Sequence, residues 1–180
     1  MKLNPEIEAI EVMAKIILTS ARTAPKAKGE DEIVTGIVED QEALANEMEK
    51  IAGRDEKLTF FKRDAANVRA AACVILIGLK FKKPAGVNCA ACGFDCGTIL
   101  KQPKTTGDYS GPVCSIRAVD LGIALGSAVS KAKDLAIDNR VMYTVGVAAR
   151  KVSLIDADVV LGLPLSITGK NIFFDRKILA

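Results

Sequence analysis

The run CVILIGLKF (residues 73–81) stands out in this 180-residue chain because six of its nine residues are large aliphatic or aromatic ones and only one is charged. Such residues fit a pleated, buried surface, so the run predicts a β-strand. Working outward from it, four more stretches predict strands. They are IVTGIV (33–38), KLTFFK (57–62, a short strand), RVMYTVGVA (140–148) and ADVVLGLPLSI (157–167).

Predicted helices alternate with these strands. The first begins with Asn4 as its N-cap and Pro5 in its first turn, and apolar residues then recur at helical spacing as far as Ala21. The others run from the N-cap Asp40 to about Ala52, over 63–72, and from the N-cap Ser115 to about 135, this last with Ile116, Val119, Ile123 and Ala128 on one face. The elements lack the regular βαβ rhythm of a doubly wound sheet, so we expect a single α+β layered domain over 1–180.

Composition narrows the classes of function. The formal charge is only +3, there is no tryptophan, and aromatic residues are 4% of the chain, so nucleic acid is not an expected partner. The chain has no histidine, which removes the most common general base and the histidine-containing zinc and haem sites.

The chain also lacks signs of export or membrane insertion. Glu6, Glu8 and Glu11 do not suit a secretory signal, and the apolar run 70–79 is too short to cross a bilayer. We therefore expect a soluble cytoplasmic protein without a membrane partner. In that reducing compartment, five cysteines favour a metal or redox site over a disulfide framework.

Four of these cysteines form a recognisable pattern. Cys89, Cys92, Cys96 and Cys114 have the spacing C-x2-C-x3-C-x17-C. Three close thiolates can wrap one corner of an inorganic iron–sulfur cluster, and a distant fourth can close the cage. Neighbouring glycines let backbone N–H groups approach the sulfides, and Cys114 precedes a predicted helix whose positive end favours an anionic assembly. The sequence therefore predicts a 4Fe-4S cluster.

Structural zinc is the alternative, because four thiolates also satisfy tetrahedral Zn²⁺. Zinc sites usually pair two Cys-x2-Cys knuckles, whereas here three thiols crowd one segment and one stands apart, which favours iron–sulfur. Cys73 lies within the apolar run AACVILIGL and is interpreted as a small buried hydrophobic residue.

The stretch GVNCAACGFDC resembles the ferredoxin-type domain of electron-transport iron–sulfur subunits and corrinoid iron–sulfur proteins. That resemblance covers residues 86–114 and implies an inserted iron–sulfur cluster loop with the four cysteines as ligands. The chain departs from the pattern in two ways: the family usually has one more residue before the third cysteine, and Cys114 is not followed by proline.

The flanking regions resemble the nitroreductase family. ILTSARTAPKAKG (17–29) is similar to its helix ending in Ala-Pro, AVDLGIALGSAVSKAKDLAI (118–137) to its long helix, and VVLGLPLSITGKNIFFDRK (159–177) to its closing strand. The combination resembles an uncharacterised bacterial and archaeal family whose members contain a ferredoxin domain. It implies a nitroreductase-like layered domain with an inserted four-cysteine loop.

This resemblance implies FMN as a second cofactor, with the flavin pocket built across a homodimer interface. The early Arg-Arg-Ser motif of nitroreductases is absent, so phosphate binding falls to other cations, which could equally be solvated surface charges. The candidates are Arg22, Lys26 and Lys28, joined by Lys170 or Arg176.

We therefore expect an iron–sulfur protein, with FMN as an additional cofactor, that transfers electrons to a small acceptor or a protein redox partner. Cofactors carry such chemistry, so the missing histidines are no obstacle. A non-enzymatic redox sensor, carrier or scaffold, holding iron–sulfur or zinc, is the alternative, and the sequence leaves open whether the protein is a nitroreductase-like oxidoreductase.

Overall fold

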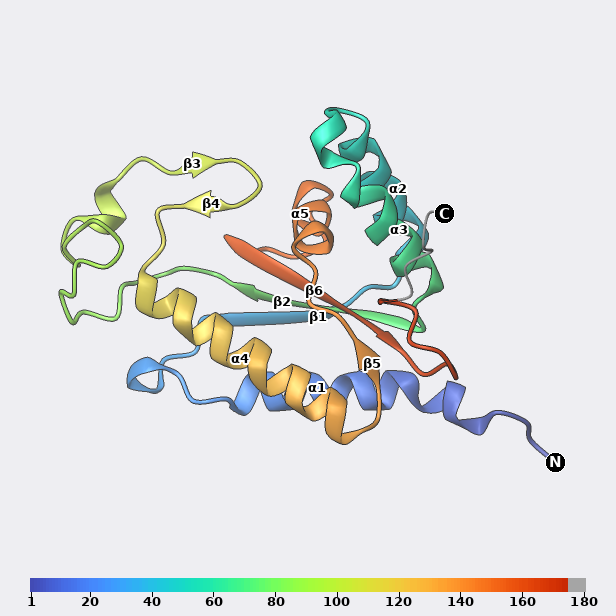
Figure 1. Cartoon of the computed structure of the whole chain (residues 1–180). Helices are drawn as coiled ribbons and strands as arrows, with labels where there is room; N and C mark the ends of the chain where they lie inside the picture. Colours follow the sequence, from blue (N-terminus) through green and yellow to red (C-terminus); the bar gives the residue numbers. More distant parts are fainter. Residues whose placement is uncertain (175–180) are drawn as a thin grey trace.

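The computed structural model describes residues 1–174 and is organised around a four-stranded antiparallel sheet (Figure 1). The strands follow the order β1 (Ile33–Ile37), β2 (Cys73–Leu79), β6 (Val159–Ser166) and β5 (Asp138–Asn139). Leu79 pairs with both Ile33 and Val159, which marks one end of the sheet, whereas Cys73 pairs with Leu165 at the other end.

Helices cover both faces of the sheet. Helices α1 (Ile10–Thr23) and α4 (Ser115–Asp134) lie on one face, and α2 (Gln41–Ala52), α3 (Phe60–Ala70) and α5 (Tyr143–Lys151) lie on the other (Figure 1). Because strand side chains alternate between faces, β2 serves two cores: Ile75 and Ile77 pack with α1 and α4, and Val74 and Leu76 pack with the other three helices.

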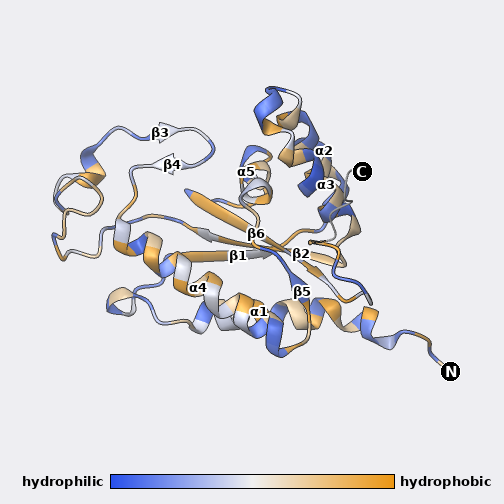
Figure 2. Ribbon diagram, in the orientation of Figure 1, coloured by the Kyte–Doolittle hydropathy of each residue, from blue (hydrophilic) through white to orange (hydrophobic). Residues whose placement is uncertain are grey.

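Hydropathy follows this layering. Figure 2 shows hydrophobic residues concentrated in β1, β2 and β6, whereas the short strand β5 is hydrophilic, and hydrophilic residues lie on the outer sides of the helices. All of β2 is buried, as its continuous apolar sequence predicts. The predicted strands 33–38 and 157–167 correspond to β1 and β6, and the predicted helix after Asp40 corresponds to α2.

The first helix begins differently from the prediction. Asn4 makes no capping hydrogen bond and has a left-handed backbone with φ of 52°. The segment Pro5–Ala9 is a 3-10 helix, and α1 begins only at Ile10. Asn4 turns the backbone but leaves the first N–H groups without a side-chain acceptor.

The predicted short strand 57–62 is wrong. Asp55 accepts a hydrogen bond from the N–H of Lys57 at 2.8 Å and starts a 3-10 helix, Glu56–Leu58, which leads into α3. Phe61 is 1% exposed because this helix packs against the sheet and its neighbouring helices. Burial of one helical face outweighs the strand preference of the aromatic pair.

The predicted strand 140–148 is also wrong. Only Asp138–Asn139 and an isolated bridge at Met142 pair with β6, and the chain then forms α5. Every residue from Thr144 to Ala149 is buried, so tertiary packing outweighs the strand preference of the two valines. Gly146 permits this packing, because a Cβ there would lie 1.8 Å from the carbonyl oxygen of Val160.

The predicted long helix is present as α4, but the apolar residues predicted to share one face are not equally buried. Val119 and Ile123 are 55% and 39% exposed, whereas Leu121, Ala124 and Ala128 are buried. Ser115 is the first helical residue and Cys114 occupies the N-cap position without a side-chain capping bond. The rotation of α4 places two polar side chains, Arg117 and Asp120, in the interior.

Residues 80–114 contain Cys89, Cys92, Cys96 and Cys114 and are called the cysteine segment below. They form a long excursion beyond the sheet, at the N-terminal end of α4 (Figure 1). Its regular structure is limited to a 3-10 helix, Ile99–Lys101, and a hairpin of β3 (Thr105–Thr106) and β4 (Ser110–Gly111). A further 3-10 helix, Ala27–Gly29, lies between α1 and β1. Among the described residues, we find no helix with the length and apolar character that a membrane span requires.

Candidate functional site

The four predicted metal ligands lie at one end of the molecule. Cys89 is exposed, Cys92 and Cys96 are partly buried, and Cys114 is 3% exposed just before α4. All four are free thiols. Cys92 packs against the same core cluster that contains Cys114, so the loop folds back toward the start of α4.

Cys73 is separate from this group. It lies in β2 and is 6% exposed, as its apolar surroundings predict. Burial raises the pKa of the Cys73 thiol, which keeps it protonated and unreactive. Its position in the sheet supports a packing role.

Side chains within the cysteine loop hold its turns. The Asn88 side-chain oxygen accepts a hydrogen bond from the N–H of Cys96 at 2.8 Å. Asp95 accepts from the N–H groups of Gly97 and Thr98, at 2.8 and 3.1 Å. Hydrogen bonds from the Thr98 hydroxyl and the Gly97 N–H lower the pKa of Asp95. The loop is therefore ordered by its own polar groups.

The backbone around the thiols has an unusual conformation. Positive φ angles recur at Gly86, Asn88, Ala90 and Gly93, with values of 72°, 53°, 57° and 83°. Concave N–H arrays that bind anions, including iron–sulfur clusters, are built from such alternation of left-handed and other residues. Ala90 is a notable case, because a non-glycine residue rarely adopts this conformation.

The donor set suits a metal centre chemically, since it consists of four free thiols beside such a backbone. Across residues 1–174, however, no group of three His, Cys, Asp or Glu side chains is arranged to hold a metal ion. The structure places the cysteines at one end of the molecule without closing them into a ligand set.

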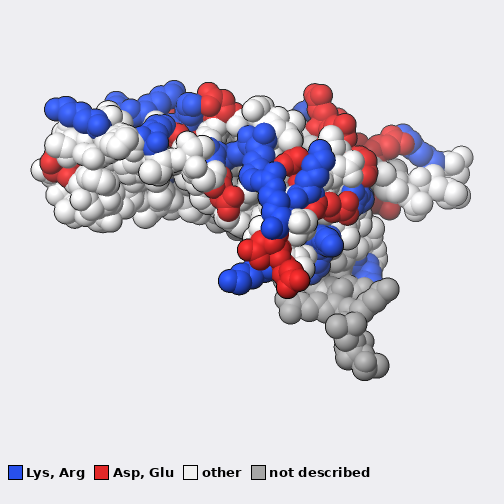
Figure 3. Space-filling view, turned by 90° about the horizontal axis from the view of Figure 1, so that it is seen from above, with Lys and Arg blue, Asp and Glu red and all other residues white. Residues whose placement is uncertain are grey.

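Lys and Arg side chains lie along one edge of this end of the molecule (Figure 3). Figure 3 shows them predominating at the left, over the cysteine segment, whereas both signs mix over helices α2 and α3. Lys80 pairs with Asp156, Lys83 with Glu30 at 2.8 Å, and Lys104 with Asp158 at 2.6 Å. These pairs tie the start and the middle of the segment to the rest of the fold.

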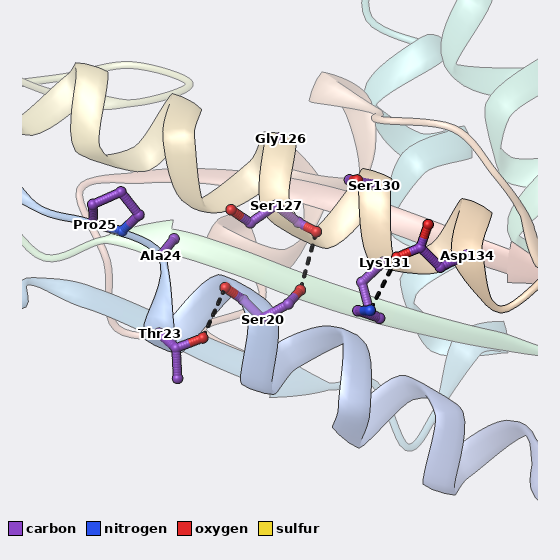
Figure 4. Close-up of a pocket in the computed structure, with 9 residues that line it drawn as sticks. All are labelled: Ser20, Thr23, Ala24, Pro25, Gly126, Ser127, Ser130, Lys131 and Asp134. Atoms are coloured by element: carbon purple, nitrogen blue, oxygen red, sulfur yellow. Dashed lines mark hydrogen bonds and ion pairs between the residues drawn. The ribbon is translucent and has the colours of Figure 1, made fainter.

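A groove of about 550 Å³ runs between α1 and α4 (Figure 4). Hydroxyl groups and one ion pair line it, and Ser20 donates a hydrogen bond across it to the carbonyl of Ser127 at 3.1 Å. The groove borders Ala24 and Pro25, the residues that resemble the nitroreductase motif. Its lining residues are Ser20, Thr23, Ala24, Pro25, Gly126, Ser127, Ser130, Lys131 and Asp134.

Two of the predicted phosphate-binding cations have local partners. Arg22 pairs with Asp31 at 2.6 Å and donates to the carbonyl of Ile33. Lys26 is 5% exposed and donates to the carbonyl groups of Arg22 and Ala24, at 2.6 and 2.8 Å. In the described part of the chain, the Arg22 and Lys26 side chains are therefore already bonded to protein groups near the end of α1.

Lys28 differs from these two. It is exposed, has a φ of 58°, and has no ion-pair partner among residues 1–174. Its ammonium lies beside the cysteine loop, because a Cβ on Gly86 would be 3.2 Å from Lys28 Nζ. Of Arg22, Lys26 and Lys28, Lys28 alone makes no ion pair within residues 1–174, so it is the best placed to meet a phosphate.

The remaining two predicted cations are not near the first three. Lys170 follows β6 at the end of the sheet marked by Leu165, whereas Arg22 and Lys28 precede Ile33 at the opposite end. Arg176 lies outside the described residues. Within one chain, the structure therefore does not bring Lys170 together with the Ala-Pro loop.

One polar cluster that the sequence did not predict is centred on Arg117, which is 0% exposed. It contacts the carboxylates of Asp120 and Glu32 at 3.1 and 3.8 Å, and it also pairs with Glu30. Burial opposes the charge of the guanidinium, yet the hydrogen bond to Asp120 and the charge of Glu32 raise the pKa of Arg117 overall. The available signal was the spacing of Arg117 and Asp120, one turn apart on a predicted helix.

Comparison with known proteins identifies relatives of this chain. Residues 110–176 match a family described as uncharacterized proteins containing a ferredoxin domain (DUF2148). This segment includes Cys114 but begins after Cys89, Cys92 and Cys96. An uncharacterized protein of Archaeoglobus fulgidus is 48% identical over 172 residues, covering 94% of this chain and 92% of that protein.

Solved structures share the fold. The NADPH:FMN oxidoreductase of Vibrio harveyi, complexed with NAD+, has a TM-score of 0.56 and 16% identity over 94% of this chain and 64% of its own. A nitroreductase with bound FMN from Desulfitobacterium hafniense has a TM-score of 0.57 and 13% identity, covering 88% of this chain and 78% of its own. This chain thus spans less than two thirds of the Vibrio enzyme.

Identities this low establish the fold alone, and they confirm the predicted α+β, nitroreductase-like architecture. The archaeal relative covers nearly the whole chain at a much higher identity. The chain therefore belongs to the family of uncharacterized proteins containing a ferredoxin domain, and it has the nitroreductase fold.

Proposed function

We propose that this protein is an iron–sulfur redox protein that transfers electrons to a small acceptor, with FMN as a second cofactor. One observation carries the proposal: four free thiols lie at one end of a nitroreductase fold, in a segment whose backbone repeatedly adopts left-handed conformations. The ferredoxin domain named in the family description supports it.

In this proposal, residues 86–114 are an inserted loop, and Cys89, Cys92, Cys96 and Cys114 hold a 4Fe-4S cluster. The cluster supplies single-electron transfer when bound. The chain itself contributes the N–H groups of the loop and the positive N-terminal end of α4, both of which favour a negatively charged centre.

The α1–α4 groove is the proposed flavin site on this chain, because it borders Ala24 and Pro25 of the Ala-Pro loop, which continues to Lys28. Lys170 and the Ala-Pro loop occupy opposite ends of the sheet, so they can meet at one flavin only if two chains contribute. FMN is named for two of the structures that share this fold, which supports the flavin but does not place it.

A homodimer is therefore part of the proposal. The outer sides of α1 and α4 expose Val12, Ile16, Val119 and Ile123, at 58%, 43%, 55% and 39%. Exposed apolar side chains on two adjacent helices are suited to a subunit interface. We propose that the dimer works in the cytoplasm, where free cysteines persist, and that its partners are small molecules or a protein redox carrier.

Oxygen-free purification followed by iron, sulfide, zinc and flavin analysis tests the proposal. We expect a brown protein with about four iron and four sulfide per chain and broad absorption at about 400 nm. Cys92→Ser should lose the iron, whereas the matched control Cys73→Ser should keep it. A colourless protein with one zinc per chain would replace this function with a zinc scaffold, and equal iron loss in both variants would overturn the ligand assignment.

The flavin is tested separately through Lys28. Lys28→Ala should weaken FMN binding by roughly tenfold or more, because a charge-assisted hydrogen bond to phosphate is removed. Lys57→Ala, at an exposed lysine beside α3, is the control and should bind FMN like the wild type. Equal affinity in Lys28→Ala and wild type, measured by fluorescence titration, would show that the phosphate lies elsewhere.

A further inference from the structure

Arg117 joins three segments that are distant in the sequence. It lies in the first turn of α4, three residues after Cys114, and its side chain is 0% exposed. Its guanidinium donates to Asp120 Oδ2 at 3.1 Å on the same helix, and to the carbonyl groups of Ala27 at 3.1 Å and Lys83 at 3.3 Å. It also donates to the carboxylate of Glu30.

The carboxylates around Arg117 extend the network to the backbone. Glu32 accepts hydrogen bonds from the N–H groups of Lys82 and Lys83, each at 3.1 Å. Asp120 Oδ1 accepts from the N–H of Ala27 at 2.9 Å. Glu32 and Asp120 are 6% and 4% exposed, so these bonds are shielded from water. The loop before β1, the start of the cysteine segment and α4 are thereby held as one unit.

Only an arginine can make all of these contacts. Its planar fork presents five N–H donors in fixed directions, whereas a lysine ammonium is a point charge with three donors. Within residues 1–174, every buried side-chain nitrogen and oxygen has a hydrogen-bond partner. Replacement of Arg117 by lysine would leave some of the surrounding acceptors unpaired and the three carboxylates less well neutralised.

The location of the network connects it to the candidate metal site. Lys82 and Lys83 begin the cysteine segment, and Cys114 ends it. The ammonium of Lys28, on the loop that contains Ala27, also lies against Gly86 of the cysteine loop. Any loosening around Arg117 would therefore free both ends of the segment at once.

The geometry points to Arg117 as the positioning residue of the metal site: it holds the two ends of the four-cysteine segment and the Ala-Pro loop in one fixed arrangement. This inference rests on the proposed function only for the identity of the bound group. The network itself predicts that Cys114 is kept at a set position even in the metal-free protein.

Thiol alkylation of the metal-free protein tests this arrangement. Iodoacetamide modification of Cys114 and Cys73, followed by mass spectrometry, reports how often each buried thiol becomes accessible. In Arg117→Lys, Cys114 should react at least about tenfold faster than in wild type, while Cys73 reacts at the wild-type rate. Arg69→Lys, which weakens ion pairs to Glu42 and Glu49 on the other face of the sheet, is the matched control and should change neither rate.

An unchanged Cys114 rate in Arg117→Lys would overturn the inference. An equal rise at Cys73 would also overturn it, because Arg117 would then stabilise the whole fold rather than the cysteine segment. If Arg117→Lys fails to fold, Asp120→Asn provides the second test: it removes one charge but keeps an acceptor for Ala27, and it should accelerate Cys114 alone.

Iron loading separates this inference from the proposed function. After anaerobic reconstitution with iron and sulfide, Arg117→Lys should hold less iron per chain than wild type and Arg69→Lys. If wild type takes up no iron, the electron-transfer proposal fails, and the alkylation rates still decide whether Arg117 positions Cys114.

Discussion

Gly146 and Gly162 are the tightest points between α5 and the sheet. A Cβ at Gly146 would lie 1.8 Å from the carbonyl oxygen of Val160, and one at Gly162 would lie 2.1 Å from the Val145 side chain. Real Cβ atoms do not approach other atoms this closely, so the backbone or the helix would have to move. At these positions, the absence of a side chain sets the distance between the layers.

Gly146→Ala should therefore destabilise the protein by about 3 kcal/mol or more, since the clash is with backbone rather than with a flexible side chain. Denaturant unfolding measures the loss. Gly36→Ala is the control, because a Cβ on Gly36 in β1 meets no atom within 4 Å and should leave stability within about 0.5 kcal/mol. A loss below about 1 kcal/mol in Gly146→Ala would mean that α5 is not packed this closely.

At the scale of single elements, Asp40 stabilises the N-terminus of α2. The Asp40 carboxylate accepts a hydrogen bond from the N–H of Ala43 at 2.8 Å, the arrangement expected of an N-cap. Asp40→Ala should reduce the free energy of unfolding by about 1 kcal/mol. The neighbouring residue Glu39 is exposed and makes no such bond, so Glu39→Ala should leave the free energy of unfolding unchanged. Similar losses of unfolding free energy in both variants would contradict the role of Asp40 as N-cap.

The β3–β4 hairpin is held on α5 by polar contacts. The Tyr143 hydroxyl donates to the carboxylate of Asp108, and Arg150 donates to the hydroxyl of Ser110 at 2.6 Å. Burial and the hydrogen bond to Asp108 raise the pKa of Tyr143 to about 12 from the model-compound value of 10.0. The neutral phenol is therefore favoured in the folded protein.

This shift predicts a pH dependence. The unfolded chain loses the Tyr143 proton above pH 10.0, while the folded protein keeps it until about pH 12, so stability falls across that interval. Tyr143→Phe removes this contribution. The difference in unfolding free energy between wild type and Tyr143→Phe should shrink from pH 10 to 12, as measured by denaturant titration at each pH. A constant difference would show that the phenol titrates alike in both states.

At the scale of the whole molecule, the layered fold leaves an apolar outer side on α1 and α4. Val119 and Ile123 are exposed there although they are large hydrophobic residues. Ile123→Lys should weaken the proposed homodimer by more than tenfold in dissociation constant, because a charge would enter the interface. Sedimentation velocity at micromolar concentration measures this change.

Val152→Lys is the control for this prediction. Val152 follows α5 on the opposite face of the sheet and is 41% exposed, close to the value for Ile123. It should leave the assembly unchanged. A wild-type protein that sediments as a monomer, or a dimer that tolerates Ile123→Lys, would refute this interface.

The sequence was a good guide wherever a local pattern decides structure. The apolar run 73–81 predicted β2, Asp40 predicted the start of α2, and the spacing after Ser115 predicted α4. It failed where distant contacts decide. Residues 140–148 have the composition of a strand but lead into α5, and of the apolar residues predicted to share one face of α4, Ala128 is buried whereas Val119 and Ile123 are exposed.

The candidate site, like the fold, was predicted from the sequence only in part. Residue type and spacing alone selected the four cysteines and separated them from Cys73, whose burial in β2 agrees with that interpretation. Residue type and spacing could not show that the Lys26 ammonium donates to carbonyl groups at the end of α1. Nor could they show that Lys170 lies at the far end of the sheet, or that Arg117 is buried. The Lys26 contacts are local but need the backbone turn after α1, whereas the positions of Lys170 and Arg117 depend on groups far away along the chain.

By itself, then, the amino-acid sequence determined most of the helices and strands, the mixed α+β class and the set of thiols, because backbone preference, capping and ligand chemistry are properties of near neighbours. Only the tertiary structure decided that β2 lies between two cores, that α4 turns Arg117 inward, and that α5 is a helix. Burial is a property of a residue's surroundings in space, and those surroundings come mainly from segments that the local sequence does not specify.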